Sequence, residues 1–219
     1  MSCTVRPTRA ALVLVSVLAF LAPASHGAAP PASPPPGSLP PHLILVPLCR
    51  QETGYTCGVA ATQALLCYHL DCGWRQDRLA RKLKADPQTG TRYKAIQRFF
   101  QSQGYSAEVH TDMTLQDLEA SLDAGTPVIC LIQAWAGHPV EYAADWDDGH
   151  YVVAVGYDAE QVYFMDPSTL GSYTFIPVGE FVARWHDMDP VSGARLVHFG
   201  MLVAKASAHY TPGGLRHME

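Results

Sequence analysis

The sequence lacks an excess of basic residues, a long apolar run and an internal repeat. Its 15 Lys and Arg residues are outnumbered by 20 Asp and Glu residues, which gives a formal net charge of −5. Nucleic acids and anionic membrane surfaces recognise basic footprints, so this charge balance argues against both as partners. The longest apolar run, residues 10–22, is too short to cross a bilayer comfortably, and we expect no stable membrane span in the mature chain.

Charged residues are also scarce, at 16% of the chain against 48% hydrophobic residues, which is typical of a packed globular core rather than of disorder. The 219 residues suit one domain with additional segments. We expect residues 42–206 to form that domain. An extended proline-rich spacer is expected before it, at 28–41, and a polar tail after it, at 207–219.

Residues 1–27 have the pattern of a signal peptide. Arg6 and Arg9 precede the apolar run, and small residues follow it near Ser25. An uncleaved N-terminal anchor is the alternative, and both interpretations predict export to the periplasm or the exterior of a bacterial cell. No cysteine lies at the expected cleavage site, which argues against a lipid anchor.

The chain has six cysteines, and Cys3 would leave with the signal peptide. An odd number in an oxidising compartment indicates that one thiol stays unpaired. If Cys57 is that thiol, the remaining four can pair in three ways, between which the sequence does not choose. The short separation of Cys67 and Cys72 makes that bridge conceivable; the other two candidates are Cys49 and Cys130.

The order of expected elements predicts an α+β fold, in which N-terminal helices pack on a mostly antiparallel sheet. Helices are expected at 58–70, 76–85, 91–103 and 178–185. A further helix should begin after Thr114, where Asp117 completes a capping box, and end at Gly125. Strands are expected at 42–48, 105–110, 127–134, 150–157, 161–165, 173–176 and 196–204.

The stretch QETGYTCGVAA places Gln51 six positions before Cys57, where a loop gives way to a helix-forming run. Thr56 is the expected N-cap, which leaves Cys57 in the first helical turn. The partial positive charge of a helix N-terminus stabilises a thiolate, and its N–H groups can hold an oxyanion beside the Gln51 amide. This arrangement predicts a nucleophilic cysteine; the alternative is a buried structural cysteine.

A nucleophilic cysteine needs a base, and the base needs a group that orients it. His150 opens an apolar strand directly after the Asp147-Asp148-Gly149 loop, and Asp166 ends the next strand. Because a tight hairpin can bring the far ends of its strands together, we expect His150 and Asp166 to be neighbours. The alternatives are a strand-end histidine and a turn-forming aspartate before Pro167.

The blocks QETGYTCGVAATQALLCYHL, GHYVVAVGYD and VYFMDPST resemble those of the bacteriocin-processing cysteine peptidases, family thirty-nine of the cysteine peptidases, in the papain-like clan. The resemblance spans about residues 42–204. It implies a papain-like fold with Cys57 as nucleophile, His150 as base, Asp166 as orienting residue and Gln51 in the oxyanion hole. Thr56 departs from the Asp or Glu usual before the nucleophile.

The best-known members of that family are domains of export transporters that cut after a Gly-Gly leader. This chain has no transporter segment and is similar instead to stand-alone, secreted relatives, so the leader specificity is not carried over. We expect a monomer that acts on a peptide or protein substrate without a metal or cofactor. A transferase or amidase, which would use the same thioester, and a non-catalytic binding module are the alternatives.

The sequence also contains two candidate metal-ligand sets and a group of aromatic residues around His150. A calcium loop at Glu141, Asp145, Asp147 and Asp148 fits no standard spacing, which favours a solvated acidic loop. Zinc at Cys67, His69 and Cys72 lacks an evident fourth ligand. The aromatic residues around His150 could line a cleft or form core; they are Trp135, Tyr142, Trp146 and Tyr151.

Overall fold

The computed structural model describes residues 39–40 and 42–205. The expected signal peptide, most of the proline-rich spacer and the polar tail lie outside the described residues. None of the helices in the described part is long and apolar enough to cross a membrane.

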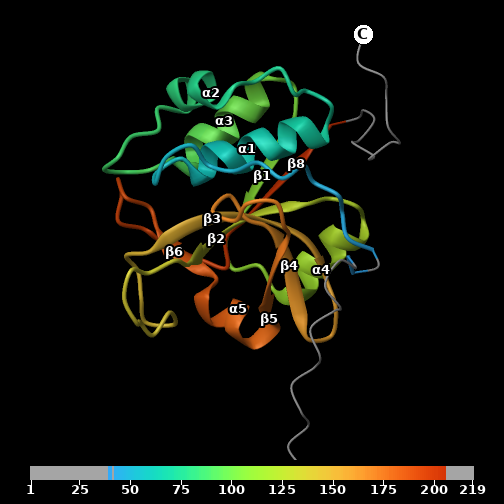
Figure 1. Cartoon of the computed structure of the whole chain (residues 1–219), viewed down its shortest axis with the longest axis vertical. Helices are drawn as coiled ribbons and strands as arrows, with labels where there is room; N and C mark the ends of the chain where they lie inside the picture. The colour runs from blue at the N-terminus through green and yellow to red at the C-terminus, as the bar shows by residue number, and fades with distance from the viewer. Residues whose placement is uncertain (1–38, 41, 206–219) are drawn as a thin grey trace, which may run out of the picture. The chain divides into compact units, whose positions relative to one another are not determined.

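Three helices form a layer on one face of the central sheet (Figure 1). They are α1 (Cys57–Tyr68), α2 (Gln76–Leu83) and α3 (Tyr93–Ser102). Leu65 of α1 and Phe100 of α3 are fully buried and belong to the same apolar cluster as Ile129 and Val153 of the sheet. Because this packing fixes α1 on the central strands, it also fixes the position of Cys57 relative to the sheet.

The sheet has six strands in the order β1-β8-β2-β3-β4-β5, and every neighbouring pair is antiparallel. Its centre is β3, whose residues are buried from His150 to Gly156 because helices cover both faces. The strands are β1 (Ser106–His110), β2 (Val128–Gln133), β3 (Gly149–Tyr157), β4 (Gln161–Met165), β5 (Thr174–Pro177) and β8 (Gly200–Ala204).

The opposite face of the sheet is covered by α4 (Leu115–Asp123) and α5 (Val178–Arg184) (Figure 1). Trp185 and Phe181 are fully buried there and stack at 4.7 Å between ring centroids. Thr114 and Asp117 form the predicted capping box at the start of α4. Helices on both faces of an antiparallel sheet confirm the predicted α+β architecture.

Two strand predictions are wrong. Residues 42–48 form no strand, because Val46 N donates back to the Ile44 carbonyl and only Ile44 N donates to β3, at Val155. The final strand is two strands, β7 (Arg195–Val197) and β8, because His198 between them has a φ of 48°. β7 pairs with β6 (His186–Met188), a short strand that the sequence did not predict.

None of the five described cysteines forms a disulfide in this structure. The Cys72 thiol donates instead to the carbonyl of Cys67, with 3.8 Å between sulfur and oxygen. Cys130 is fully buried in β2.

Candidate active site

Cys57 is the first residue of α1 and is 8% exposed. Thr56 stands at the N-cap position as predicted, but its hydroxyl does not cap the helix. It donates to the Thr53 carbonyl and accepts from Thr53 N, at 3.1 and 3.0 Å. Thr56 therefore closes the turn that leads into α1 and fixes the point at which Cys57 enters the helix.

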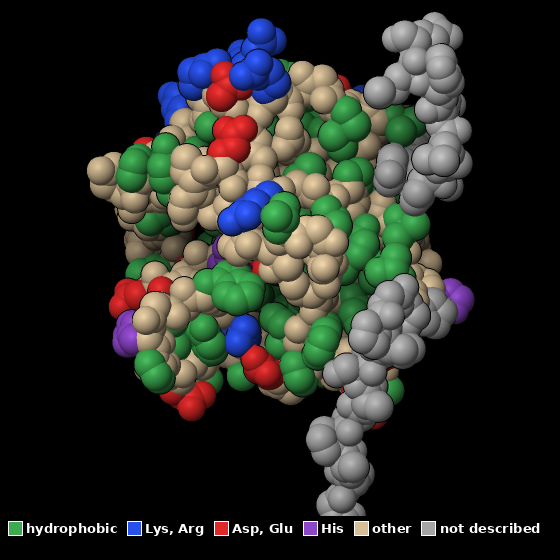
Figure 2. Space-filling view, viewed as in Figure 1, with side chains coloured by type: hydrophobic (Ala, Val, Ile, Leu, Met, Phe, Trp, Pro, Cys, Tyr) green, Lys and Arg blue, Asp and Glu red, His purple; other side chains and the backbone are tan. Residues whose placement is uncertain are grey.

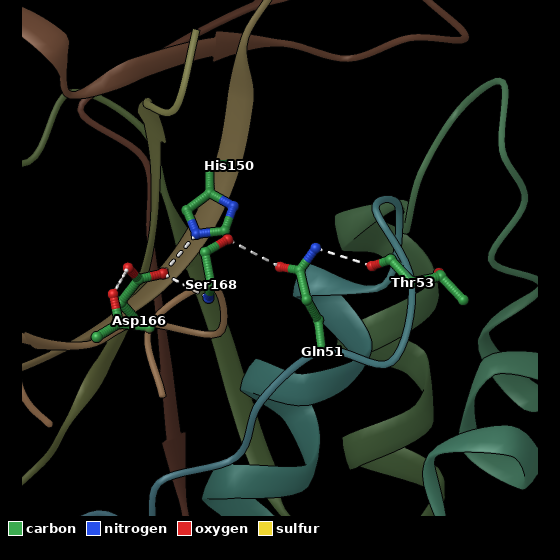
Figure 3. Close-up of polar contacts among 6 residues, drawn as sticks. Gln51, Thr53, His150, Asp166 and Ser168 are labelled. Carbon is green, nitrogen blue, oxygen red and sulfur yellow. Dashed lines mark hydrogen bonds and ion pairs between the residues drawn. The ribbon is translucent and has the colours of Figure 1, made fainter. Parts of the chain in front are cut away.

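His150 and Asp166 lie in contact, with 2.7 Å between His150 Nε2 and Asp166 Oδ1 (Figure 3). They come from the start of β3 and from the residue after β4, so the β3–β4 hairpin brings them together. Both are buried, at 6% and 3% exposure. A buried carboxylate on Nε2 fixes the ring and leaves Nδ1 for another partner.

The Asp166 carboxylate is held by the residues that follow it. Oδ1 accepts from Ser168 N at 2.8 Å, and Oδ2 accepts from the Thr169 hydroxyl at 2.8 Å. Sequence reasoning missed both donors. The run Asp-Pro-Ser-Thr could have indicated them, because an aspartate before a turn commonly accepts from the N–H two residues on.

The three groups shift one another's pKa values toward the charged forms. Burial opposes ionisation of Cys57, but hydrogen bonding to His150 and the ring's charge leave the Cys57 pKa below its ordinary 9.0. Burial also opposes protonation of His150, yet hydrogen bonds with Asp166 and Cys57 raise its pKa from 6.5 to about 9. The Asp166 pKa is lowered despite burial, chiefly by His150. These directions favour a thiolate and an imidazolium, with the ring held by a carboxylate.

Gln51 lies in the loop before α1, on the far side of Ser168 from Asp166 (Figure 3). Its backbone N donates to the Pro167 carbonyl at 3.0 Å, and its side-chain oxygen accepts from the Ser168 hydroxyl at 3.2 Å. Its amide nitrogen donates to the Thr53 carbonyl at 2.8 Å. Since an amide nitrogen carries two hydrogens, these bonds orient the group and leave one N–H available for a substrate oxygen.

Two cavities flank this group of residues. One, of about 470 Å³, is lined by Cys57, Gly149, Trp146 and Tyr151. The other, of about 660 Å³, is lined by Asp166 together with Trp135 and Tyr142 among other residues. The four aromatic residues singled out in the sequence therefore line cavities, two on each side. Tyr151 is at the same time buried, at 7% exposure.

Within the described residues, no group of three or more His, Cys, Asp or Glu side chains is arranged to hold a metal ion. In the loop proposed as a calcium alternative, Asp145 Oδ1 accepts from Asp147 N, as in a hydrogen-bonded turn. The other alternative set contains Cys72, which is engaged with the Cys67 carbonyl.

Comparison with known proteins identifies the family. A family model described as the Peptidase_C39 like family matches residues 43–192, more than half of the chain. The chain belongs to the Peptidase_C39 like family. The predicted family resemblance is thereby confirmed, and membership of this family supports a cysteine peptidase.

Solved structures show the fold of this C39-like chain in other proteins, each at 18% identity. A Bacillus anthracis protein named a C39-like peptidase has a TM-score of 0.56 and covers 76% of this chain and 98% of its own. The peptidase domain of Streptococcus ComA, a bi-functional ABC transporter involved in a quorum sensing pathway, scores 0.54 over 73% and 98%. A double glycine motif protease from an AMS/PCAT transporter, in complex with the leader peptide, scores 0.51 over 74% and 92%. No curated protein matches the chain in sequence.

Proposed function

We propose that this C39-like chain is an exported cysteine peptidase that hydrolyses a peptide bond through Cys57, His150, Asp166 and Gln51. The observation that carries the proposal is the buried 2.7 Å contact of His150 with Asp166, next to the cysteine that starts α1. Burial alone would raise the pKa of Cys57, but hydrogen bonding to His150 lowers it below its ordinary value. A cysteine kept as thiolate next to a protonated, oriented imidazole is the nucleophile–acid pair that acyl transfer requires. The leader peptide bound by the double glycine protease supports a peptide substrate.

The reaction begins when the Cys57 thiolate attacks the substrate carbonyl carbon and its electrons move to the oxygen. The Cys57 N–H and the Gln51 amide N–H stabilise this oxyanion. His150 then gives its proton to the leaving amine as the C–N bond breaks, which leaves a thioester on Cys57 and a neutral imidazole. His150 takes a proton from water, the hydroxide attacks the thioester, and the acid product and the thiolate–imidazolium pair are released. Asp166 keeps the imidazole in the tautomer with Nδ1 toward the sulfur.

The test is cleavage of a peptide library by the full chain, compared with Cys57→Ala and with Cys72→Ser as a matched cysteine control. The proposal predicts products from the parent and from Cys72→Ser, and none from Cys57→Ala. Mass spectra with added amine separate hydrolysis from transfer: acid products support a peptidase, and amide products would show a transferase. Equal cleavage by Cys57→Ala, or no cleavage of any peptide, would overturn the proposal in favour of another site or a binding module.

A further inference from the structure

The cavity beside Cys57 is lined by more acidic than basic side chains. It lies between the start of α1, the residues before α3, the start of β3 and the β6–β7 hairpin, and three aspartates line it: Asp147, Asp187 and Asp189. Among the described residues that line it, Arg92 alone is a Lys or Arg. Arg92 also lines the neighbouring cavity that contains Lys82, Lys84 and Arg98.

Figure 2 shows where charged side chains gather on one face of the molecule. Lys and Arg side chains gather at the top, over α2, where Lys82, Lys84 and Arg98 line a separate basic cavity. Asp and Glu side chains lie at the lower left, beside the loop that leads into β3 in Figure 1, and others lie among the Lys and Arg side chains at the top.

Asp187 is a half-buried aspartate of this cavity, and the protein pairs only one of its carboxylate oxygens. Its Oδ1 accepts from Met188 N at 2.8 Å and from Gln133 Nε2 at 3.3 Å. Within the described part of the chain, its Oδ2 receives no hydrogen bond and no Lys or Arg pairs with it. Asp189 is more deeply buried, at 4% exposure, but its Oδ1 accepts from Val191 N and from the N–H and hydroxyl of Ser192, and these bonds keep the pKa of Asp189 low despite burial.

The electrostatics of Asp187 match this incomplete pairing. Burial raises the pKa of Asp187 to about 6, and the nearby charges of Asp145 and Asp189 add to the effect. A carboxylate that is withdrawn from water without a cationic partner is stabilised by any cation that enters beside it.

Tyr151 gives a second, independent indication of a ligand. Its side chain is 93% buried, since 7% is exposed, and within the described residues its hydroxyl has no hydrogen-bond partner. Burial, followed by the charges of Asp187 and Cys57, raises the Tyr151 pKa well above its ordinary value. Its hydroxyl is therefore within electrostatic reach of both residues, on the cavity wall that all three share. A hydroxyl that opens into a cavity without a protein partner is available to hydrogen-bond a ligand.

Gly149 sets how close Asp187 lies to the reacting groups. A Cβ at Gly149 would collide with both oxygens of the Asp187 carboxylate. Because Gly149 has no side chain, that carboxylate packs directly against the β3 backbone, one residue before His150. The charge thus stands next to the point where the scissile bond would lie.

We infer that the cavity beside Cys57 is a substrate subsite for a positively charged group, with Asp187 as the residue that determines specificity. The inference rests on the proposed peptidase function. The group is a Lys or Arg side chain adjacent to the scissile bond, and the Tyr151 hydroxyl is the second acceptor for its N–H donors. A charge-assisted hydrogen bond in a partly desolvated cavity typically corresponds to roughly 10- to 100-fold in affinity.

The test uses N-acetylated peptides that carry Lys, Arg, norleucine or Glu at each position flanking the cleavage point. The parent should cleave Lys or Arg peptides with kcat/KM about 10- to 100-fold above norleucine at one of these positions. Asp187→Asn keeps the size and the acceptor oxygen but not the charge, so it should lose about 10-fold or more of this preference. The control Glu108→Gln, which removes an exposed carboxylate of β1, should keep it. An unchanged preference in Asp187→Asn would overturn the inference.

Binding separates this inference from the proposed function. In the Cys57→Ala background, fluorescence anisotropy should show tighter binding of the Lys peptide than of the norleucine peptide, and Asp187→Asn should remove the difference. This result without turnover by the parent would reject the peptidase and keep the subsite. Turnover with equal binding and equal cleavage of Lys and norleucine peptides would keep the peptidase and reject the subsite. The same peptides without the N-acetyl group form a further arm. If tighter binding or faster cleavage appears only with these free N-termini, the cation is the substrate's α-ammonium, and the assignment to a Lys or Arg side chain is overturned.

Discussion

Replacing Asp166 by Asn tests how the charge of this carboxylate acts on His150. Asn keeps the size and one acceptor oxygen, so the contact with His150 Nε2 at 2.7 Å can persist without the negative charge. Ser168 N bonds to the same oxygen and keeps it, whereas the Thr169 hydroxyl would face the amide nitrogen and would have to accept from it instead of donating. The variant therefore changes electrostatics more than geometry.

The size of the effect follows from the pKa of His150. The rise from 6.5 to about 9 corresponds to about 3 kcal/mol in favour of the imidazolium, at about 1.4 kcal/mol for each pH unit. Hydrogen bonding to Asp166 is the first of the interactions that favour the charged ring, followed by Cys57. If Asp166 supplies about half of the preference, Asp166→Asn should lower the His150 pKa to about 8. The imidazolium is present below this pKa and lost above it. The alkaline loss of activity should therefore occur about one pH unit lower in Asp166→Asn than in the parent.

The assay is an NMR titration of the His150 ring, assigned by its loss in His150→Ala, and it needs no substrate. Asp123→Asn is the control, because that exposed carboxylate accepts from Tyr157 and not from His150. An alkaline transition that stays at the parent's pH in Asp166→Asn would refute the role given to the charge. A shift of the same size in Asp123→Asn would refute the assignment to this contact.

Two further predictions concern the oxyanion donor and the packing of α1. Gln51→Ala should lower kcat about 100-fold, because the group acts on the transition state, while the urea unfolding midpoint falls only slightly through loss of the bonds to Thr53 and Ser168; an unchanged kcat would remove Gln51 from the oxyanion hole. Gly58→Ala should lower the free energy of unfolding by about 1–3 kcal/mol, because its Cβ would lie 2.8 Å from Thr91 Cβ and 3.0 Å from the Tyr151 ring. Gly54→Ala, with nothing within 4 Å, is the control; equal unfolding free energies for the two variants would contradict the packing argument.

Local signals account for the parts of the fold that the sequence predicted. The start of α1 and the capping box of Thr114 and Asp117 each depend on a few consecutive residues. The contact of His150 with Asp166 depends on one hairpin, whose strands are apolar and joined by a short turn. Such features can be predicted because the chain between their members is short or regular.

Several features formed by residues far apart in the sequence were not predicted, because no local pattern and no part of the family resemblance indicates them. Ser168 and Gln51 are 117 positions apart, and nothing near either residue indicates their bond. Asp187 reaches the cavity because the three-residue strand β6 pairs with β7 and packs its carboxylate on Gly149. A strand of this length carries too little periodicity to be recognised. The Thr56 hydroxyl bonds to Thr53 rather than to the helix because the preceding turn competes for it.

The most direct test of the central claim is a titration of the chain with iodoacetamide, in which residual peptide cleavage and the label on each cysteine are measured together. We predict that cleavage falls in proportion to carboxamidomethylation of Cys57. Labelling of Cys72, which is exposed, should have no effect, and Cys72→Ser should titrate like the parent. Cleavage that persists when Cys57 is fully labelled would contradict the assignment of Cys57 as the nucleophile.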